Sequence, residues 1–350
     1  MPEAVIGWDV GGAHVKAARC EGGTVVDVVQ WPCALWQGLD KLDVVLDAAL
    51  ERWPDFAHAA HAVTMTGEMA DCFAHREDGV ARIAAHLAAR LPAPRFFAGD
   101  GWCTAAECGP RWEAVASANW LATARHAAAA LAPEAGLLVD IGSTTTDFIA
   151  FGGGRVASPS RRDVDRLASG ELVYHGVVRT PLCALARRIP WCGRPLNVMN
   201  EFFATTADVY RLSGELDPAH DQYPAADGGA KDTAGSRARL ARMIGLDARD
   251  ASDAEWDEFA RSWRAEQTAE LRGQLARVAA AQGLPRDAVA VAAGCGSFLV
   301  AEIVPPGWRV MSYVGAVAAV APEARAWAQV AAPAVAVAAL YEREAGRCGS

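Results

Sequence analysis

Two short glycine-containing segments supply the carboxylates that could hold a metal-bound anion. The first is Asp9-Val10-Gly11-Gly12, at the end of an apolar run, with Lys16 just beyond it. Glycine amides approach a phosphate without obstruction from a Cβ, a carboxylate holds hydrated Mg²⁺, and the lysine adds positive charge. The pattern predicts a phosphate loop, although it is also typical of a structural strand-to-turn Asp-Gly pair.

The second segment places two carboxylates around one glycine and four consecutive hydroxyls. Its polar members are Asp140, Gly142, Ser143, Thr144, Thr145, Thr146 and Asp147. Hydroxyls and amides bind anionic oxygens, and carboxylates orient metal-bound water. Asp9 and Asp140 are therefore the predicted Mg²⁺ ligands, and a threonine-rich surface strand is the structural alternative.

A third glycine loop contains Gly294, Gly296 and Ser297 and again follows an apolar run. Apolar residues follow it as well, which predicts a helix whose N-terminus favours an anion or the edge of a nucleotide. Taken singly, this loop is not specific.

The segments between these loops alternate between strand and helix patterns. Apolar residues recur at helical spacing, and short β-branched runs end at glycine, as expected for an α/β protein. The polar stretch 216–235 lacks periodicity and predicts an exposed loop. Helices are predicted at 39–53, 79–91, 120–131, 236–244 and 253–282. Strand patterns lie at 4–11, 24–32, 61–69, where a strand runs into a glycine turn, 95–99, 136–151, which is a strand, a glycine loop and a second strand, and 289–294.

Composition excludes several classes of protein. A chain of 350 residues with 52% hydrophobic content can bury a large core, and a net charge of -9 argues against nucleic-acid binding. No secretory signal is recognised at the start, and 326–340 is interrupted by Gln329 and Pro333, so it predicts a buried terminal helix and not a membrane span. We expect a cytoplasmic protein with nine reduced cysteines and no membrane partner, and the sequence leaves its oligomeric state open, a homo-oligomer included.

The order of the three loops resembles the two phosphate loops and the adenosine loop of the actin/Hsp70/sugar-kinase superfold. This resemblance implies a two-lobed α/β (ribonuclease H-like) fold with a central ligand cleft. The expected N-terminal lobe is 1–133, with the first phosphate loop. The expected C-terminal lobe is 134–350, with the other two loops and a terminal helix that packs back on the first lobe.

Four segments narrow the resemblance. They are Thr66–Phe73, Ala118–Trp120, Asp140–Asp147 and Gly170–Pro181. Together they resemble the hydantoinase A/oxoprolinase-related proteins encoded with tetrahydromethanopterin-linked C1 metabolism, and within them the methanofuran (methylofuran) core synthases. The match spans nearly the whole chain. That resemblance implies a transferase that joins the phenol of γ-glutamyl-tyramine to an aminomethyl-furan diphosphate and releases pyrophosphate, with Mg²⁺ and without ATP.

Under this resemblance the glycine loops bind the leaving diphosphate, and a carboxylate takes the phenol proton. Glu68 and Glu171 are the candidate bases, each with the alternative of a structural carboxylate in the first turn of a helix. Arg179 either grips a phosphate or the glutamyl carboxylate or is a surface guanidinium, and Lys231 either folds over a phosphate or stays mobile. Asn119 and Glu201 complete the predicted binding residues, and 197–210, which includes Asp208 and Tyr210, either lines the cleft or forms a solvated helix face.

Two other classes of function stay open. An ATP-dependent kinase or a hydantoinase-type hydrolase of the same superfold would use the third glycine loop for a nucleotide. A nonenzymatic nucleotide sensor or chaperone is the other alternative, although no segment resembles a separate peptide-binding domain.

Overall fold

The computed structural model describes residues 4–348 and divides into two compact units built from interleaved segments. Unit 1 takes in 1–136, 149–166 and 311–350, and unit 2 takes in 137–148 and 167–310. The chain therefore passes from one unit to the other four times, and the last 40 residues belong to the unit that also contains the N-terminus.

A six-stranded sheet forms the centre of unit 1, in the order β3-β2-β1-β4-β5-β6. β1 is buried along its whole length and pairs antiparallel with β2 and parallel with β4. Its position between two neighbours explains why its sequence is apolar up to Asp9. The strands are β1 (Val5–Val10), β2 (His14–Glu21), β3 (Thr24–Pro32), β4 (Ala60–Met65), β5 (Arg95–Phe97) and β6 (Trp102–Cys103).

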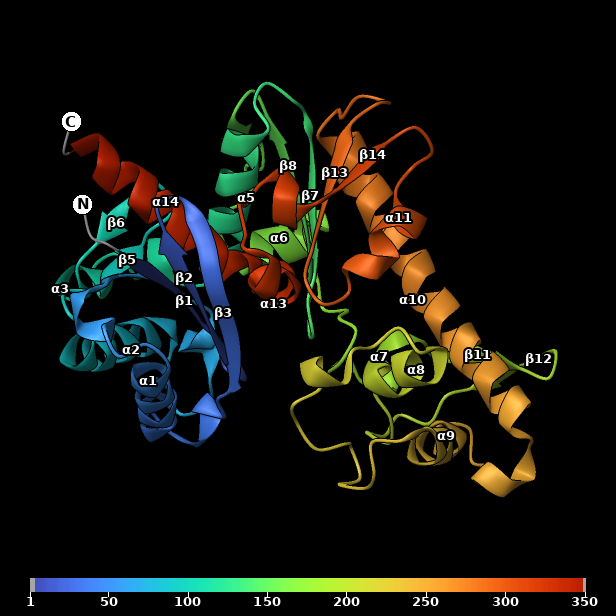
Figure 1. Ribbon diagram of the computed structural model, residues 1–350. Coiled ribbons are helices and arrows are strands. Elements are labelled where there is room, and N and C mark those ends of the chain that lie inside the picture. Colours follow the sequence, from blue (N-terminus) through green and yellow to red (C-terminus); the bar gives the residue numbers. More distant parts are fainter. Residues whose placement is uncertain (1–3, 349–350) are drawn as a thin grey trace. The chain divides into compact units, whose positions relative to one another are not determined.

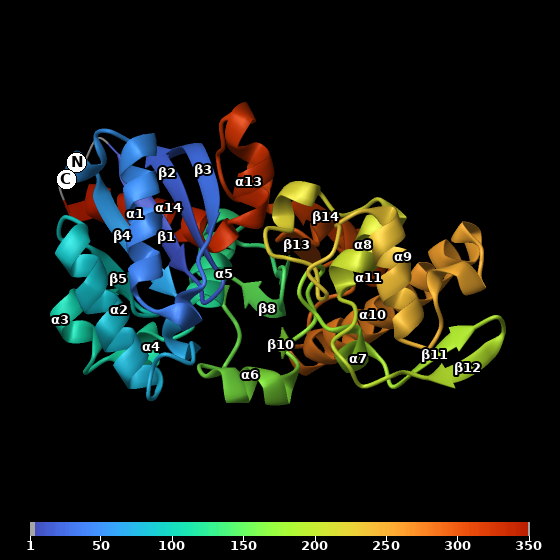
Figure 2. The same cartoon turned by 90° about the horizontal axis from the view of Figure 1, so that it is seen from below.

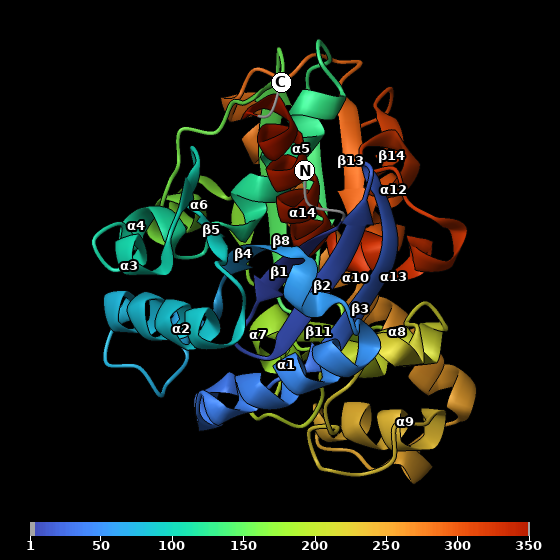
Figure 3. The ribbon, with the colours of Figure 1, turned by 60° about the vertical axis from the view of Figure 1, so that its left-hand side comes forward.

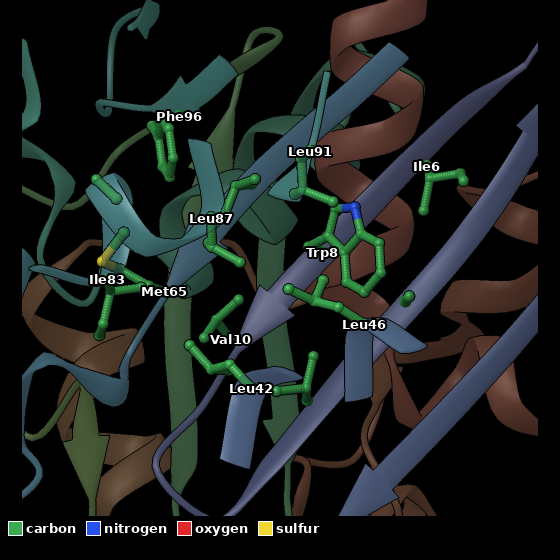
Figure 4. Packing of buried hydrophobic residues seen from close by; sticks show 14 of the residues in the cluster. Ile6, Trp8, Val10, Leu42, Leu46, Met65, Ile83, Leu87, Leu91 and Phe96 are labelled. Atoms are coloured by element: carbon green, nitrogen blue, oxygen red, sulfur yellow. The ribbon is translucent and has the colours of Figure 1, made fainter. Parts of the chain in front are cut away.

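Helices cover both faces of this sheet (Figures 1 and 3). On one face, α1 (Asp40–Arg52) and α2 (Arg76–Arg90) contribute Leu46 and Leu87 to a core with Trp8, as Figure 4 shows. On the other face, α14 (Ala332–Cys348) packs against β1.

Gly7 makes the second of these contacts possible. A Cβ at this position would lie 2.1 Å from the carbonyl oxygen of Ala334 and 2.7 Å from the amide nitrogen of Ala338. The backbones of β1 and α14 therefore approach more closely than any side chain permits.

Most of the second sheet belongs to unit 2, and its order is β10-β8-β7-β13-β14, with β9 paired to β8. The long helix α10 packs against α8 and α9 (Figure 2). Trp256, Phe259 and Trp263 of α10 are buried in the core that these helices share. The strands are β7 (Gly136–Ile141), β8 (Thr146–Gly152), β9 (Arg155–Val156), β10 (Leu172–Val173), β13 (Val289–Ala293) and β14 (Arg309–Ser312). The helices are α8 (Thr206–Ser213), α9 (Thr233–Arg242) and α10 (Asp253–Ala281).

The remaining elements are short, apart from α5. They are the two-stranded hairpin β11 (Arg188–Trp191) and β12 (Arg194–Asn197), and α3 (Ala105–Cys108), α4 (Trp112–Val115), α5 (Asn119–Ala130), α6 (Asp163–Ser169), α7 (Leu182–Leu185), α11 (Val300–Ile303), α12 (Tyr313–Ala316) and α13 (Arg325–Val330).

The alternation of strand and helix predicted from the sequence is confirmed. The helices predicted at 39–53, 120–131 and 253–282 correspond to α1, α5 and α10 within two residues at each end. The helix predicted to begin at Gly79 begins earlier, because the His75 side chain accepts a hydrogen bond from the Asp78 amide and caps the first turn. Within residues 4–348, none of the helices has the length and apolar character needed to cross a bilayer.

The contact at Gly7 gives a stability prediction. Gly7→Ala forces a Cβ into the backbone of α14, so we expect the free energy of unfolding to fall by about 3 kcal/mol. Gly273→Ala is the matched control, because Gly273 lies exposed on α10 and a Cβ added there would meet nothing within 4 Å. Denaturant unfolding should show this control unchanged or stabilised by up to about 1 kcal/mol. Equal stabilities of the two variants would contradict the packing of α14 on β1.

Candidate active site

Asp9 lies near the end of β1 in unit 1, with Lys16 and Thr64 opposite it on the flanking strands. The Lys16 ammonium is 3.8 Å from one carboxylate oxygen, and the other oxygen, Oδ1, has no hydrogen-bond partner among the residues the structure describes. Burial raises the pKa of Asp9 and the nearby Lys16 partly offsets that rise. A buried oxygen of this kind suits a hard cation or a bound water.

The donors around Asp9 are compatible with Mg²⁺ only if the ligand supplies further oxygens. In residues 4–348 no group of three or more His, Cys, Asp or Glu side chains is arranged to hold a metal. Mg²⁺ commonly uses one or two carboxylates together with waters and substrate phosphates. Asp9 therefore fits a metal that arrives with a phosphorylated ligand better than a permanent all-protein site.

The loop after β1 is a tight turn. The Gly11 amide donates to the His14 carbonyl at 3.0 Å, and a Cβ at Gly11 would lie 2.8 Å from that oxygen. A Cβ at Gly12 would meet nothing within 4 Å. The backbone at Gly12 thus has open space beside it, as the approach of an anion requires.

Glu68 lies in the short 3₁₀ turn Gly67–Met69 and is only 1% exposed. Its Oε1 accepts hydrogen bonds from the Ser117 hydroxyl at 2.7 Å and from Arg76 at 3.1 Å, whereas no group among the described residues bonds to its Oε2. Burial raises the pKa of Glu68 above its usual range, against the opposing effect of Ser117 and Arg76. One carboxylate oxygen is fixed, and the other is available to take a proton.

A series of ion pairs connects Glu68 to charged residues further along the chain. Arg76 also contacts Asp163 at 3.3 Å, and Asp163 contacts Arg166 at 3.2 Å. The Arg166 guanidinium lies over the ring of Trp120, 4.3 Å from its centroid. No signal in the sequence indicated these partners of Glu68, because the ionic contacts join segments without a shared motif.

Asn119, predicted as a ligand-binding residue, has a local structural role in the same region. Its side-chain oxygen accepts a hydrogen bond from the Trp120 amide at 2.8 Å, and its carbonyl accepts one from the Thr123 hydroxyl. Both bonds stabilise the first turn of α5.

In unit 2 the structure brings the second and third glycine loops together. Gly294 has a φ of +84°, and a Cβ there would lie 2.2 Å from the Ile141 carbonyl oxygen and 2.5 Å from the Asp140 carboxylate. The Gly296 amide donates to the same carbonyl at 2.8 Å. Only glycine permits this approach, so the third loop presses directly on the end of β7.

The segment after β10 packs on the other side of the second loop. A Cβ at Gly176 would lie 2.3 Å from the backbone of Ser143 and Thr144, and the Arg179 amide donates to the Ser143 carbonyl at 2.8 Å. The side-chain hydroxyls of Ser143, Thr144 and Thr145 are half-buried and make no hydrogen bond within the described part of the chain. Thr146 differs, because its hydroxyl donates to the His175 carbonyl at 2.6 Å.

A helix follows the third loop, as predicted, but it is short. Ser297–Leu299 form a 3₁₀ turn, and α11 adds only four residues. So short a helix lacks an appreciable dipole, which weakens the predicted attraction of its N-terminus for an anion, and the Pro305-Pro306 pair prevents its extension.

Glu171 lies between α6 and β10 and does not begin a helix. It is buried, its Oε2 accepts a hydrogen bond from the Ser169 hydroxyl at 3.0 Å, and its Oε1 has no partner among the described residues. Like Glu68, it combines one fixed oxygen with one that is available.

The other predicted binding residues of unit 2 are more exposed. Arg179 lies over the ring of Tyr223 at 5.8 Å, and Glu201 is exposed. The Lys231 ammonium donates to the Tyr223 carbonyl at 2.7 Å and also to the carbonyl of Asp221. Lys231 is thus held by its own loop, and Asp147 is half-buried on β8 opposite Leu172.

Asp208 and Tyr210 belong to the interior of unit 2, which corrects both alternatives considered from the sequence. Asp208 accepts from the fully buried Arg239 at 2.8 Å, and the Tyr210 hydroxyl donates to Gln267 at 2.8 Å. Arg239 also donates to the Ala230 carbonyl and so anchors the otherwise largely exposed loop 216–235.

Comparison with known proteins places this geometry in a family. A model of the hydantoinase/oxoprolinase family matches residues 59–343, which is most of the chain. The chain belongs to this family. A solved structure of nucleotide-free acetone carboxylase, from work on ATP-dependent acetone carboxylation, aligns with a TM-score of 0.57 over 97% of this chain and 70% of its own, at 12% identity. With the two sheets, this likeness confirms the α/β fold of the actin/Hsp70/sugar-kinase superfold.

Two curated relatives of this hydantoinase/oxoprolinase chain have the same name, (4-{4-[2-(γ-L-glutamylamino)ethyl]phenoxymethyl}furan-2-yl)methanamine synthase. The protein from Methanocaldococcus jannaschii is 31% identical over 263 residues, which are 74% of this chain and 77% of the relative. The protein from Methanococcus vannielii is 35% identical over 108 residues, which are 31% of this chain and 48% of the relative.

The environment of Glu68 gives a pH prediction. Its pKa is raised from 4.5 in the folded state, so the wild-type chain loses stability as the pH rises from the unfolded pKa through the folded one. Glu68→Gln has no such proton. The unfolding free energy of this variant minus that of wild type should therefore increase with pH over this interval and then level off.

The matched control for this measurement is Glu255→Gln at the start of α10. Hydrogen bonds from Ser252 lower the pKa of the exposed Glu255. The unfolding free energy of Glu255→Gln minus that of wild type should therefore not change with pH above about pH 5.5. Urea unfolding between about pH 4 and 8 compares the two variants. A flat profile for Glu68→Gln would show that Glu68 is not destabilised by burial.

Proposed function

We propose that this chain forms an aryl alkyl ether. In this reaction the phenol oxygen of γ-glutamyl-tyramine attacks the methylene carbon of an aminomethyl-furan diphosphate. The carbon–oxygen bond to the diphosphate breaks, pyrophosphate leaves with the electron pair, and a base takes the phenol proton. The observation that best supports this is the 31% identity to the Methanocaldococcus jannaschii synthase over 77% of its length, since the name of that relative specifies a phenoxymethyl-furan product.

This reaction does not require a covalent bond between the protein and a substrate. The furan oxygen can spread positive charge from the methylene carbon, so departure of the diphosphate is the step that needs assistance. A magnesium ion, when bound, would neutralise charge on the departing pyrophosphate. The protein must bind the diphosphate, orient the phenol and accept its proton.

In unit 1, Asp9 binds the metal ion and Lys16 adds positive charge. The backbone at Gly11 and Gly12 binds the anion. The unpartnered Oδ1 of Asp9 and the open space beside Gly12 support these roles. We assign the proton acceptor to Glu68, because its raised pKa and free Oε2 suit a general base. Asn119 is a weaker candidate for ligand binding, because its side-chain oxygen already accepts a hydrogen bond from the Trp120 amide in α5.

In unit 2 the proposal assigns the second metal-binding carboxylate to Asp140 and phosphate contacts to the loop that follows it. The three available hydroxyls of Ser143, Thr144 and Thr145 support this assignment, because they form a row of donors in a half-buried loop. Glu171, with its available Oε1, is the second candidate base.

We further propose that the reaction takes place in the cytoplasm and uses no nucleotide. The eight cysteines whose side chains the structure describes are all free thiols, most of them buried, as suits a reducing compartment. The reaction releases pyrophosphate from the substrate itself, so it needs no ATP.

A direct assay tests the function. The purified chain is incubated with the furan diphosphate, γ-glutamyl-tyramine and Mg²⁺, and we expect pyrophosphate and the coupled ether in equal amounts without ATP. Mass spectrometry identifies the ether, and a coupled assay measures pyrophosphate. Absence of both products would refute the proposal, and conversion of ATP to ADP with either substrate would favour the kinase or hydrolase alternative.

The two carboxylates give a mutational prediction. Asp9→Asn and Asp140→Asn each remove a metal-binding charge with little change in volume, so turnover should fall by about 100-fold or more. Asp253→Asn is the control, because that carboxylate is 79% exposed and pairs only with Arg237 among the described residues. Circular dichroism should show all three variants folded. Wild-type turnover of both Asp9→Asn and Asp140→Asn would exclude their role in metal binding.

A further inference from the structure

Unit 1 contains a cavity of about 860 Å³ whose lining includes none of the residues assigned to the reaction. The turn after β5, helix α4, one side of α5 along most of its length, the segment around β9 and the end of α14 line it. Its volume is that of a typical small-molecule pocket. All of its walls belong to unit 1, and Figure 3 shows α5 and α14 side by side behind the sheet.

The charge of the lining differs from that of the chain. Its guanidinium groups come from Arg111, Arg125, Arg155, Arg161 and Arg343. Its carboxylates come from Asp100, Glu113 and Glu344, so five positive and three negative groups give a net charge of +2. The whole chain has a net charge of -9. The cavity therefore favours a ligand with an anionic group.

Some of these charges already neutralise one another. Arg111 pairs with Asp100 at 3.4 Å, and Arg125 lies 3.9 Å from Glu344 and donates to the Gly99 carbonyl. These two arginines hold the wall in place, and they are less available to a ligand.

Three arginines have no carboxylate partner in the described chain: Arg155, Arg161 and Arg343. Arg161 is oriented by the carbonyl oxygens of Ser158 and Ser160, to which it donates at 2.9 and 2.8 Å. Glu113 likewise forms no ion pair among residues 4–348. Unpaired charges of both signs thus face one cavity, as expected for a ligand that has both a carboxylate and an ammonium group.

The rest of the wall is apolar. Trp120 and Leu121 of α5 and Leu340 of α14 line it together with several alanines. An aromatic ring with a charged head would bury its ring against these side chains and leave the head at the arginines.

The cavity also shares a segment with the Glu68 network. Ala116 and Ala118 line the cavity, and Ser117 between them donates to Glu68 at 2.7 Å. Ser117 has a φ of +50°, which is uncommon for a residue with a Cβ. The proposed base and this wall are thus held by the same three residues.

We propose that this cavity binds the acceptor of the ether synthesis, with its γ-glutamyl head at the arginines and its aromatic ring toward Trp120. A γ-linked glutamyl group keeps both its α-carboxylate and its α-ammonium free. Arg155, Arg161 and Arg343 bind the carboxylate, and Glu113 binds the ammonium. The proposal rests on the proposed function, since it names the binding site of one of its two substrates.

The test compares γ-glutamyl-tyramine with tyramine, which lacks the glutamyl head. The double variant Arg155→Gln/Arg161→Gln should raise KM for γ-glutamyl-tyramine by about 10-fold or more, because charge-assisted hydrogen bonds are lost. The value of kcat and the KM for the furan diphosphate should stay within about 2-fold of wild type, and so should kcat/KM for tyramine. Arg249→Gln is the control, because its guanidinium is 83% exposed and lies outside the cavity.

Two outcomes would overturn the proposal. A rise in the KM for the furan diphosphate alone would show that the cavity binds the other substrate. Kinetic constants of the double variant that equal those of wild type for all three compounds would show that these arginines bind neither of the two substrates.

Calorimetry separates this proposal from the proposed function. If no ether forms with any preparation, γ-glutamyl-tyramine should still bind the wild-type chain more tightly than tyramine does, and the double variant should lose that difference. Equal binding of the two compounds to the wild-type chain would refute the proposal whatever the reaction is.

Discussion

Contacts between backbones, made at positions that admit only glycine, hold both halves of the proposed machinery in place. In unit 1, Gly7 lets α14 lie on β1, the strand that ends at Asp9 and Val10. In unit 2, Gly176 and Gly294 press two separate segments onto the loop and strand end around Asp140. Because most of the atoms in contact belong to the main chain, the position of the backbone that carries each carboxylate depends on the absence of a Cβ at these glycines.

Burial of charge is the second constraint, and it acts differently in the two units. Glu68 is removed from water with only part of its hydrogen-bonding capacity used, which destabilises its ionised form. Arg76, Asp163 and Arg166 compensate by alternating positive and negative groups up to the ring of Trp120. In unit 2, Asp208 and Arg239 are buried together and fully engaged with neighbours, so they anchor a loop and have no free oxygen to react.

The sequence predicted the strands that end near Asp9 and Asp140, because buried central strands leave an apolar run that stops at a glycine. The adjacency of Gly294 and Asp140 followed only from the order of the loops in a known superfold. The network around Glu68 was beyond prediction, because Ser117, which donates a hydrogen bond to Glu68, and Asp163, which pairs with Arg76, lie 49 and 95 residues away from Glu68. Contacts at such separations leave no periodic pattern in the sequence. The cavity was missed for the same reason, because its arginines are scattered over segments whose neighbourhood only the fold defines.

The interleaving of the two units bears on how the chain is made. Because synthesis proceeds from the N-terminus, the N-terminal sheet leaves the ribosome before α14, which covers one of its faces and lies hundreds of residues later in the chain. Until then Val5 and Gly7, on the face that α14 will cover, stay uncovered, and an apolar surface of that kind is prone to aggregate. A truncation before Ala332 therefore removes the cover from a strand that lies hundreds of residues earlier in the chain.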